Sequence, residues 1–279
     1  MIYRNLALFL CIISLFSCSP KAKTAESLFN GKDLIGWDTY LGPVYDSVKN
    51  DFDTQKIIGL NNDPNGVFSI VTEDEAPPIR ISGENFGGIS TTRKFQNYHL
   101  RLEFKWGTNR WQPSKDKKRD SGLLYHAVGT HGADYGFWMR SQEFQIQEGD
   151  CGDYWGVAGG SFEVTARKED ETYVYDPTGE LITFNEANQQ VGRRCIKMQD
   201  AEKPTGQWNT IELYVLGDTA VHIVNGVTNM ILYHSSQLES GKLLPLTNGK
   251  IQLQSEGAEV FYRNILMEPI KNIPPSVLN

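Results

Sequence analysis

A short alternating segment carries the polar side chains best suited to chemistry. Glu143, Gln145 and Gln147 supply one carboxyl group and two amides. Side chains two residues apart in a strand share a face, so these groups point one way at roughly 6–7 Å spacing. Phe144 and Ile146, which lie between them, then point into a core. That spacing suits contacts with different atoms of one sugar ring, and a solvated sheet face is the alternative interpretation.

This polar row contains a single acid. Retaining hydrolysis of a glycoside uses two carboxyl groups about 5 Å apart, and the row supplies only Glu143. Ordinary glycoside hydrolysis is therefore disfavoured.

His126 is the next candidate for chemistry. Strict alternation along its strand places it on the same side as Leu124 and Val128. Together with Glu143, its imidazole could act as a general base or hold a divalent metal ion. A histidine packed within the sheet is the alternative.

Acidic and aromatic residues surround the row. Glu148, Asp150 and Asp153 lie among glycines and could form an oxygen-rich ion site or an acidic surface turn. Arg140 could donate to a ketone or enolate oxygen, or form a surface ion pair. Four aromatic residues could stack on a sugar or lie in the core. They are Phe137, Trp138, Tyr154 and Trp155.

The elements that must position these residues are strands. Apolar and polar residues alternate in many short segments, asparagine–glycine pairs mark tight turns, and no segment has a helical period. A hairpin is expected over 173–184. Two antiparallel sheets packed face to face are the natural solution, with a closed barrel as the alternative. The predicted strands are 67–71, 79–82, 98–106, 123–128, 141–148, 208–216, 220–224, 230–233, 250–254 and 260–267.

The N-terminus is typical of an exported lipoprotein. Arg4 precedes an apolar run at 6–16 that is too short to span a bilayer comfortably and resembles the core of a signal peptide. Cys18 then stands where a bacterial lipoprotein carries its lipid, and an ordinary cleaved signal is the alternative. We expect a protein anchored to the cell envelope, periplasmic or on the cell surface. The expected divisions are a signal peptide at 1–18, a tether at 19–26, one β-sandwich domain at 27–270 and a tail at 271–279.

Composition limits the possible partners. The net charge of −7 argues against general binding to nucleic acid. No dinucleotide fingerprint, phosphate loop or nucleophile elbow is present, so no nucleotide cofactor is expected. Membrane contact is expected only through the lipid. Cys151 and Cys195 could form a disulfide after export, or remain buried thiols.

Several segments, in order, resemble the 3-keto-disaccharide hydrolase family. They are LFNGKDLIGW at 28–37, SGLLYH at 121–126, EFQIQ at 143–147, KPTGQWN at 203–209, IQLQSEG at 251–257 and FYRNI at 261–265. The resemblance implies an all-β, antiparallel two-sheet jelly-roll sandwich of the concanavalin A-like lectin and glucanase type. It also implies cleavage of 3-keto-glycosides, by hydrolysis or by elimination and hydration. A non-catalytic carbohydrate-binding envelope lipoprotein is the alternative.

The resemblance further suggests which residues act. The catalytic candidates are His126, Glu143 and Gln145. The substrate-binding candidates are Tyr125, Arg140, Gln147, Trp155, Gln254 and Glu256. A divalent metal ion would lie at His126 and Glu143, or alternatively at Glu148, Asp150 and Asp153.

The implied substrate is an oligosaccharide or other glycoside oxidised at C3. Its ketone acidifies the hydrogen on C2, so a base can remove that hydrogen and the anomeric group can leave. One base, one charge stabiliser and one acid suffice for this chemistry. A separate sugar 3-oxidoreductase must supply the ketone.

Overall fold

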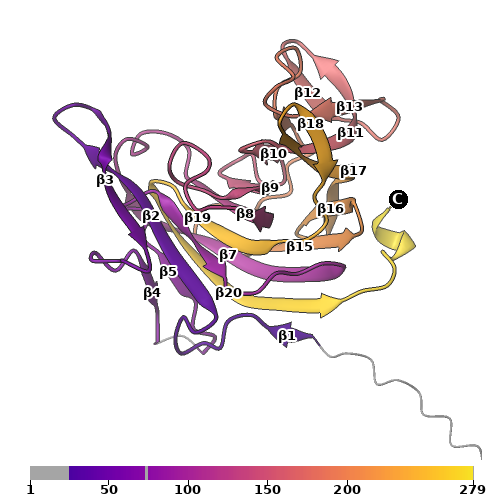
Figure 1. Cartoon of the computed structure of the whole chain (residues 1–279). Helices are drawn as coiled ribbons and strands as arrows, with labels where there is room; N and C mark the ends of the chain where they lie inside the picture. The colour runs from indigo at the N-terminus through magenta and orange to yellow at the C-terminus, as the bar shows by residue number, and fades with distance from the viewer. Residues whose placement is uncertain (1–24, 73–74, 279) are drawn as a thin grey trace, which may run out of the picture.

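The computed structural model describes residues 25–72 and 75–278, and these form two antiparallel sheets packed face to face (Figure 1). The predicted jelly-roll sandwich is confirmed. Among the described residues the one helical element is a short 3-10 turn, η1 (Pro275–Val277). None of these residues belongs to a helix long and apolar enough to cross a membrane. The expected signal peptide, Cys18 and most of the tether lie outside the described residues.

The eight-stranded sheet carries the polar row, and we call it the site sheet. Its strands are, in spatial order, β14 (Arg194–Cys195), β10 (Tyr154–Val157), β9 (Arg140–Gln147), β8 (Asp120–Val128), β19 (Lys250–Ser255), β6 (Gly87–Thr91), β2 (Trp37–Asp46) and β3 (Asp51–Leu60).

The twelve-stranded sheet packs behind it, and we call it the backing sheet. Its main order is β12 (Thr172–Tyr175), β11 (Gly160–Glu169), β17 (Val227–Glu239), β16 (Thr219–Val224), β15 (Asn209–Leu216), β7 (Tyr98–Arg110), β20 (Ala258–Pro269), β5 (Ile79–Ile81) and β4 (Phe68–Ile70). Three further strands pair with β20, β11 and β17 respectively. They are β1 (Glu26–Ser27), β13 (Glu180–Phe184) and β18 (Lys242–Pro245).

The core lies between the two sheets. Phe144 and Ile146 of β9 are fully buried there, as their alternation with polar residues predicts. The ring of Phe144 stacks on His222 of β16 with centroids 4.2 Å apart. Burial lowers the pKa of His222 to about 3, so this histidine is a neutral member of the core at physiological pH. The contact ties β9 to the backing sheet.

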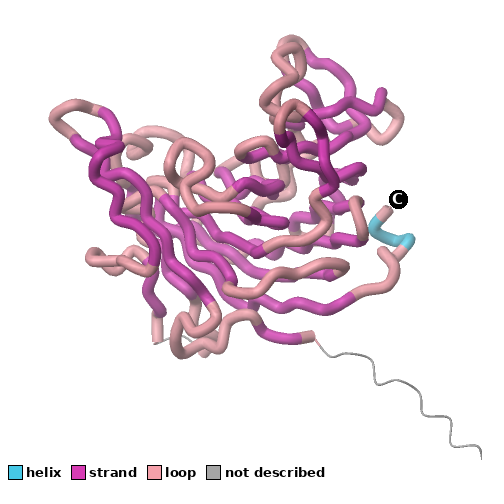
Figure 2. The backbone as a smooth tube through the Cα atoms, viewed as in Figure 1, coloured by secondary structure: helices cyan, strands magenta, loops and turns pink. Residues whose placement is uncertain are grey.

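The central strands of the site sheet are covered on both faces. Almost every residue of β8 and β9 is buried, including the polar ones. A half-exposed sheet would bury only alternate residues, as β7 and β15 do. Loops gather over the outer face of the site sheet (Figure 2). The β2–β3 hairpin rises on one side of this region and the strands β11 to β13 and β18 rise on the other (Figure 1).

The strand pairing differs from the expectation at one place. The expected hairpin over 173–184 is wrong, because β12 and β13 each pair with β11 and not with each other. Cys151 and Cys195 are both buried and free, which decides between the alternatives left open by the sequence.

Candidate functional site

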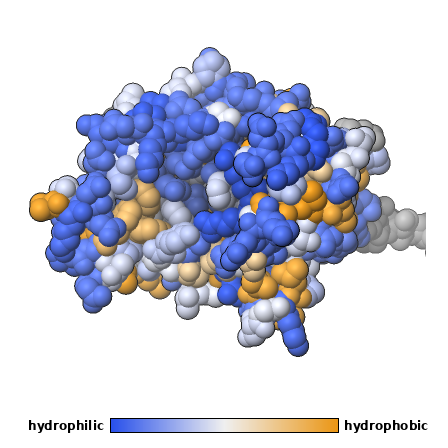
Figure 3. Space-filling model, turned by 90° about the horizontal axis from the view of Figure 1, so that it is seen from above, coloured by the Kyte–Doolittle hydropathy of each residue, from blue (hydrophilic) through white to orange (hydrophobic). Residues whose placement is uncertain are grey.

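The outer face of the site sheet holds a cavity of about 220 Å³. Seen from above, this side of the molecule is hollowed near its middle and is mostly hydrophilic (Figure 3). Four carboxyl groups line the cavity, so we call it the acidic cavity. Its lining residues are Asp120, Asp134, Trp138, Glu143, Gln145, Gln147, Trp155, Arg193, Gln254 and Glu256.

Strand register brings the central lining residues together. Asp120 of β8 pairs with Gln147 of β9, and Glu143 of β9 pairs with Trp155 of β10. Residues opposite each other in an antiparallel pair project to the same face. The four side chains therefore share the outer face of the sheet, while Phe144 and its apolar neighbour point to the core.

A glycine makes room at the centre of this face. Gly122 of β8 pairs with Gln145. A Cβ at Gly122 would lie 2.3 Å from Oε1 of Glu143 and 2.4 Å from Oε1 of Gln254. The carboxyl of Glu143 and the amide of Gln254 thus converge from two different strands over the space that a side chain would otherwise fill.

The electrostatics of the cavity favour protonated carboxyl groups. Burial, together with the charge of Asp120, raises the pKa of Glu143 well above its usual range. Burial also raises the pKa of Asp120 to about 7, although the hydrogen bond from Gln147 acts to lower it. The pKa of Glu256 is likewise raised well above normal by burial and by the charges of Asp120 and Glu143. At neutral pH the cavity therefore holds both proton donors and a carboxyl group that is partly ionised.

One cation offsets part of this negative charge. Arg193 donates to Asp134 at 3.1 Å, and Asp134 is buried. The guanidinium also lies 5.5 Å from the ring centroid of Trp155. Nε1 of Trp155 is buried without a hydrogen-bond partner among the described residues. Buried polar groups are normally paired, so this N–H is available to a bound hydroxyl or carbonyl oxygen.

The structure brings together seven of the residues singled out from the sequence. The acidic cavity is lined by Trp138, Glu143, Gln145, Gln147, Trp155, Gln254 and Glu256. The polar row itself supplies one acid, but Asp120, Asp134 and Glu256 from other segments accompany Glu143 in the cavity, so the lack of a second carboxyl group in the row does not extend to the whole site. Asp120 lies three residues before the predicted strand 123–128, and it would have been found had that strand been extended to its observed start at Asp120. Asp134 and Arg193 come from loops and gave no sequence signal.

His126 does not join this site. The β8–β9 register shifts between Tyr125 and Val128, and His126 has φ of +53°, so the strict alternation used for its placement fails at this bulge. The side chain is 1% exposed and is absent from the cavity lining. Burial lowers its pKa to about 4, partly offset by the carbonyl of Leu246. The expected pairing of His126 with Glu143, for base catalysis or for a metal ion, is therefore corrected.

Two aromatic candidates belong to the core. Tyr125 is fully buried, and its hydroxyl is hydrogen-bonded to Nε2 of His222 at 2.9 Å. Tyr154 is also fully buried and donates to Gln142 at 2.7 Å. The expected role of Tyr125 in substrate binding is corrected, because its side chain points between the sheets.

Phe137 and Arg140 also lie apart from the acidic cavity. Phe137 packs in a small aromatic cluster with Phe52 and Phe86. Arg140 donates to the carbonyl of Ala158 at 2.7 Å and to Glu239 at 3.0 Å. It lines a different cavity of about 360 Å³, so its expected contact with substrate at Glu143 is corrected.

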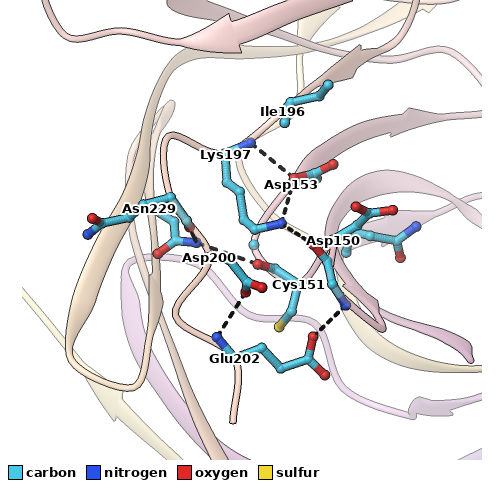
Figure 4. Close-up of polar contacts among 12 residues, drawn as sticks. Asp150, Cys151, Asp153, Ile196, Lys197, Asp200, Glu202 and Asn229 are labelled. Carbon is cyan, nitrogen blue, oxygen red and sulfur yellow. Dashed lines mark hydrogen bonds and ion pairs between the residues drawn. The ribbon is translucent and has the colours of Figure 1, made fainter. Parts of the chain in front are cut away.

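The acidic turn after β9 is an ion-pair network. Asp153 is fully buried and accepts from Arg194 at 2.6 Å. It also accepts from the backbone N–H of Lys197 at 3.0 Å (Figure 4). Asp150 accepts from Lys118 at 2.8 Å, and Arg119 donates to Glu148 at 2.9 Å.

The alternative metal site expected at Glu148, Asp150 and Asp153 does not agree with this network. Each of Glu148, Asp150 and Asp153 is already paired with a cationic side chain. Lys197 also donates to the carbonyl of Gly149 at 2.6 Å, which fixes the turn from inside. Within the described residues, no group of three or more histidine, cysteine or acidic side chains is placed to hold a metal ion.

The fold and the cavity together define a class: a jelly-roll sandwich with an acidic cavity on the outer face of one sheet. The chain belongs to the family of 3-keto-alpha-glucoside-1,2-lyase-like domains, whose model matches residues 24–268. Membership of this family supports a carbohydrate-related function and a sugar as the ligand. No curated protein sequence matches the chain.

Solved structures with similar shapes include both enzymes and binding modules. A candidate glycosyl hydrolase from Parabacteroides distasonis is 18% identical, with 88% of this chain and 94% of that chain covered and a TM-score of 0.47. The carbohydrate binding module CBM66 from Bacillus subtilis is 8% identical, with 72% and 91% covered and a TM-score of 0.43. A Bacillus subtilis protein with a galectin-like fold is 11% identical, with 88% and 95% covered and a TM-score of 0.44.

Proposed function

We propose that the acidic cavity cleaves 3-keto-glycosides by removing the hydrogen on C2. The observation that carries this proposal is the placement of two carboxyl groups in one cavity, Glu143 buried and Asp120 partly buried, with the pKa of each raised by burial. Catalytic acids and bases are made from groups whose surroundings shift their pKa values apart. Membership of the family supports a sugar as the substrate, and the cavity contains the groups proposed as acid and base.

In this mechanism Asp120 acts as the general base and Glu143 as the general acid. Asp120, with a pKa raised to about 7 by burial, is partly ionised at neutral pH and takes the proton from C2. The electron pair of the broken C–H bond forms an enolate with its charge on the C3 oxygen. Glu143, whose pKa is raised well above its usual range by burial, remains protonated and donates to the departing glycosidic oxygen. As that bond breaks, the C1–C2 double bond forms and the C3 ketone is restored.

Neutral and cationic donors stabilise the enolate. The amides of Gln145 and Gln254, the indole N–H of Trp155 and the guanidinium of Arg193 all line the same cavity. Fixed hydrogen-bond donors directed at a developing oxyanion stabilise the transition state far more in a buried site than in water. Water that adds across the new double bond then gives net hydrolysis. The carboxyl groups of the cavity are not placed to hold a metal ion together, since no three acidic, histidine or cysteine side chains of the described residues converge in that way.

The proposed chemistry places the protein after an oxidation. The substrate must already carry a ketone at C3, and a separate sugar 3-oxidoreductase supplies it. We also propose that the protein is exported and anchored through Cys18, which would place the reaction at the cell envelope.

The test compares matched substrates and solvents. Purified protein lacking residues 1–18 is incubated with methyl 3-keto-glucoside and with methyl glucoside in D₂O. We expect cleavage of the ketone only, with deuterium at C2 of the recovered substrate or a 2-hydroxyglucal-type product. Glu143→Gln should lower turnover roughly a hundredfold or more. Glu163→Gln is the control, because Glu163 pairs with His234 on the backing sheet, away from the cavity.

A second candidate is direct hydrolysis by two carboxyl groups, and the presence of four of them in the cavity favours it. That mechanism predicts cleavage of methyl glucoside and no deuterium at C2. A carbohydrate-binding protein without catalysis predicts saturable binding and no cleavage of either substrate. Either result would overturn the elimination mechanism.

A further inference from the structure

We propose that Tyr135 forms a stacking platform for the second ring of a disaccharide substrate, beside the acidic cavity. This inference rests on the proposed function, since it assumes that the cavity holds the oxidised ring. It adds a subsite for the leaving group and identifies the residue that favours a sugar ring over a small aglycone.

The acidic cavity is too small for a whole disaccharide. Its volume is about 220 Å³, whereas pockets that enclose drug-sized ligands measure about 300–1,000 Å³. A cavity of this size accommodates about one ring. The remainder of a disaccharide must therefore contact the surface at the rim.

Tyr135 is the most exposed aromatic side chain in the described part of the chain, at 76%. Arg193, which lines the cavity, lies 5.7 Å from the Tyr135 centroid and 5.5 Å from that of Trp155. The guanidinium thus lies close both to a ring that lines the cavity and to a ring that does not. The preceding residue, Asp134, lines the cavity as well. These contacts place Tyr135 at the rim, with most of its ring surface open to solvent.

The loop around Tyr135 is held firmly against β2. The hydroxyl of Tyr40 donates to the carbonyl of Gly136 at 3.2 Å, and its ring stacks on His131 at 5.2 Å. The backbone N–H of Asp134 donates to the carbonyl of Trp138 at 3.0 Å. These contacts fix the loop on both sides of Tyr135, so little freedom is lost when a ligand binds.

Tyr135 also adopts an unfavourable backbone conformation. Its φ is +49°, a region that a bulky side chain enters only when the surrounding structure imposes it. The flanking contacts impose it here and turn the ring outward. An apolar aromatic face that is exposed and rigid is the surface on which the C–H face of a pyranose stacks.

The experiment compares two substrates and three variants. Wild type, Tyr135→Ala, Tyr135→Phe and Ile35→Ala are assayed with 3-keto-trehalose and with methyl 3-keto-glucoside. Ile35 is a matched control because it is 79% exposed and lies next to the start of β2, away from the cavity lining. We expect Tyr135→Ala to raise KM for 3-keto-trehalose about 3- to 10-fold. KM for methyl 3-keto-glucoside should change by less than about twofold. Tyr135→Phe keeps the ring and should behave as wild type.

Two results would overturn the stacking platform. An equal loss on both substrates would mean that Tyr135 only supports Arg193, and no loss on either would mean that the ring contacts nothing. If the wild type cleaved neither substrate, the proposed function would fail by itself. Binding of trehalose and methyl glucoside, followed by the intrinsic tryptophan fluorescence of the protein, would then test the platform. If Tyr135→Ala bound trehalose more weakly and bound methyl glucoside as wild type does, the platform would be upheld. Equal trehalose affinities in all variants would overturn it.

Discussion

A methyl group on Gly122 would lie 2.3 Å from Oε1 of Glu143, so the absence of a side chain at one residue gives the carboxyl of the other its place in the cavity. Gly122 is not one of the glycines with a positive φ. Its value to the protein therefore lies in the space it leaves and not in the backbone conformation it permits.

Gly122→Ala should displace Glu143 and Gln254 and lower turnover at least tenfold, while the fold is retained. The control is Gly107→Ala, which places a methyl 2.3 Å from Oε2 of Glu259 on the backing sheet. That variant should lose stability but keep its turnover. Steady-state rates and melting temperatures measured on both proteins check this. Equal loss of turnover in the two variants would show that the effect is general unfolding.

Asp120→Asn should stabilise the protein at alkaline pH. Burial raises the pKa of Asp120 to about 7 from 3.8, so the folded state binds this proton more tightly than the unfolded chain does. The stability that this proton contributes is fully present below about pH 4 and is lost as pH rises through 7. At pH 8 the variant should be more stable by about 1–4 kcal/mol. Denaturant unfolding at pH 4 and pH 8 measures the difference.

The same substitution should abolish the basic group that activity needs. In the wild type, kcat/KM should rise with pH up to about 7, where Asp120 ionises. Asp120→Asn should remove this rise and lower turnover roughly a hundredfold. A variant with the wild-type pH profile would assign the base to another group, and Glu256 would be tested next.

Phe144→Ala should cost about 3–5 kcal/mol of stability, because it leaves a cavity where the ring packs on His222. Gln145→Ala, one residue away on the other face, should cost far less. Chemical denaturation of both variants at neutral pH gives the comparison. A larger loss for the Gln145 variant would contradict the register of β9.

Cys18→Ala should abolish lipid attachment. The expectation comes from the apolar run and the position of Cys18 after it. Cells grown with a fatty-acid probe should label the wild type and not the variant. Labelling of both to the same extent would mean that Cys18 is not the acylated residue.

The polar row of β9 could be predicted from the sequence because alternation is a local property. A strand has a side-chain period of two, so the order of residues 143–147 decides which of them face the core. The same reasoning gives the strand at Tyr98 and the pairing of apolar faces into a sandwich. Gln254 and Glu256 were singled out through the family-like segment 251–257 and not by alternation, and only the position of β19 beside β8 brings them to the cavity.

Only the tertiary structure decided which groups meet. A bulge after Tyr125 turns His126 away from the cavity, and period-two reasoning cannot detect an inserted residue. Asp134 and Arg193 reach the cavity from loops whose course depends on long-range contacts with distant strands. The proton affinities of Glu143 and Asp120 depend on burial by those same loops, so the sequence determined the strand faces and the packed fold determined the chemistry.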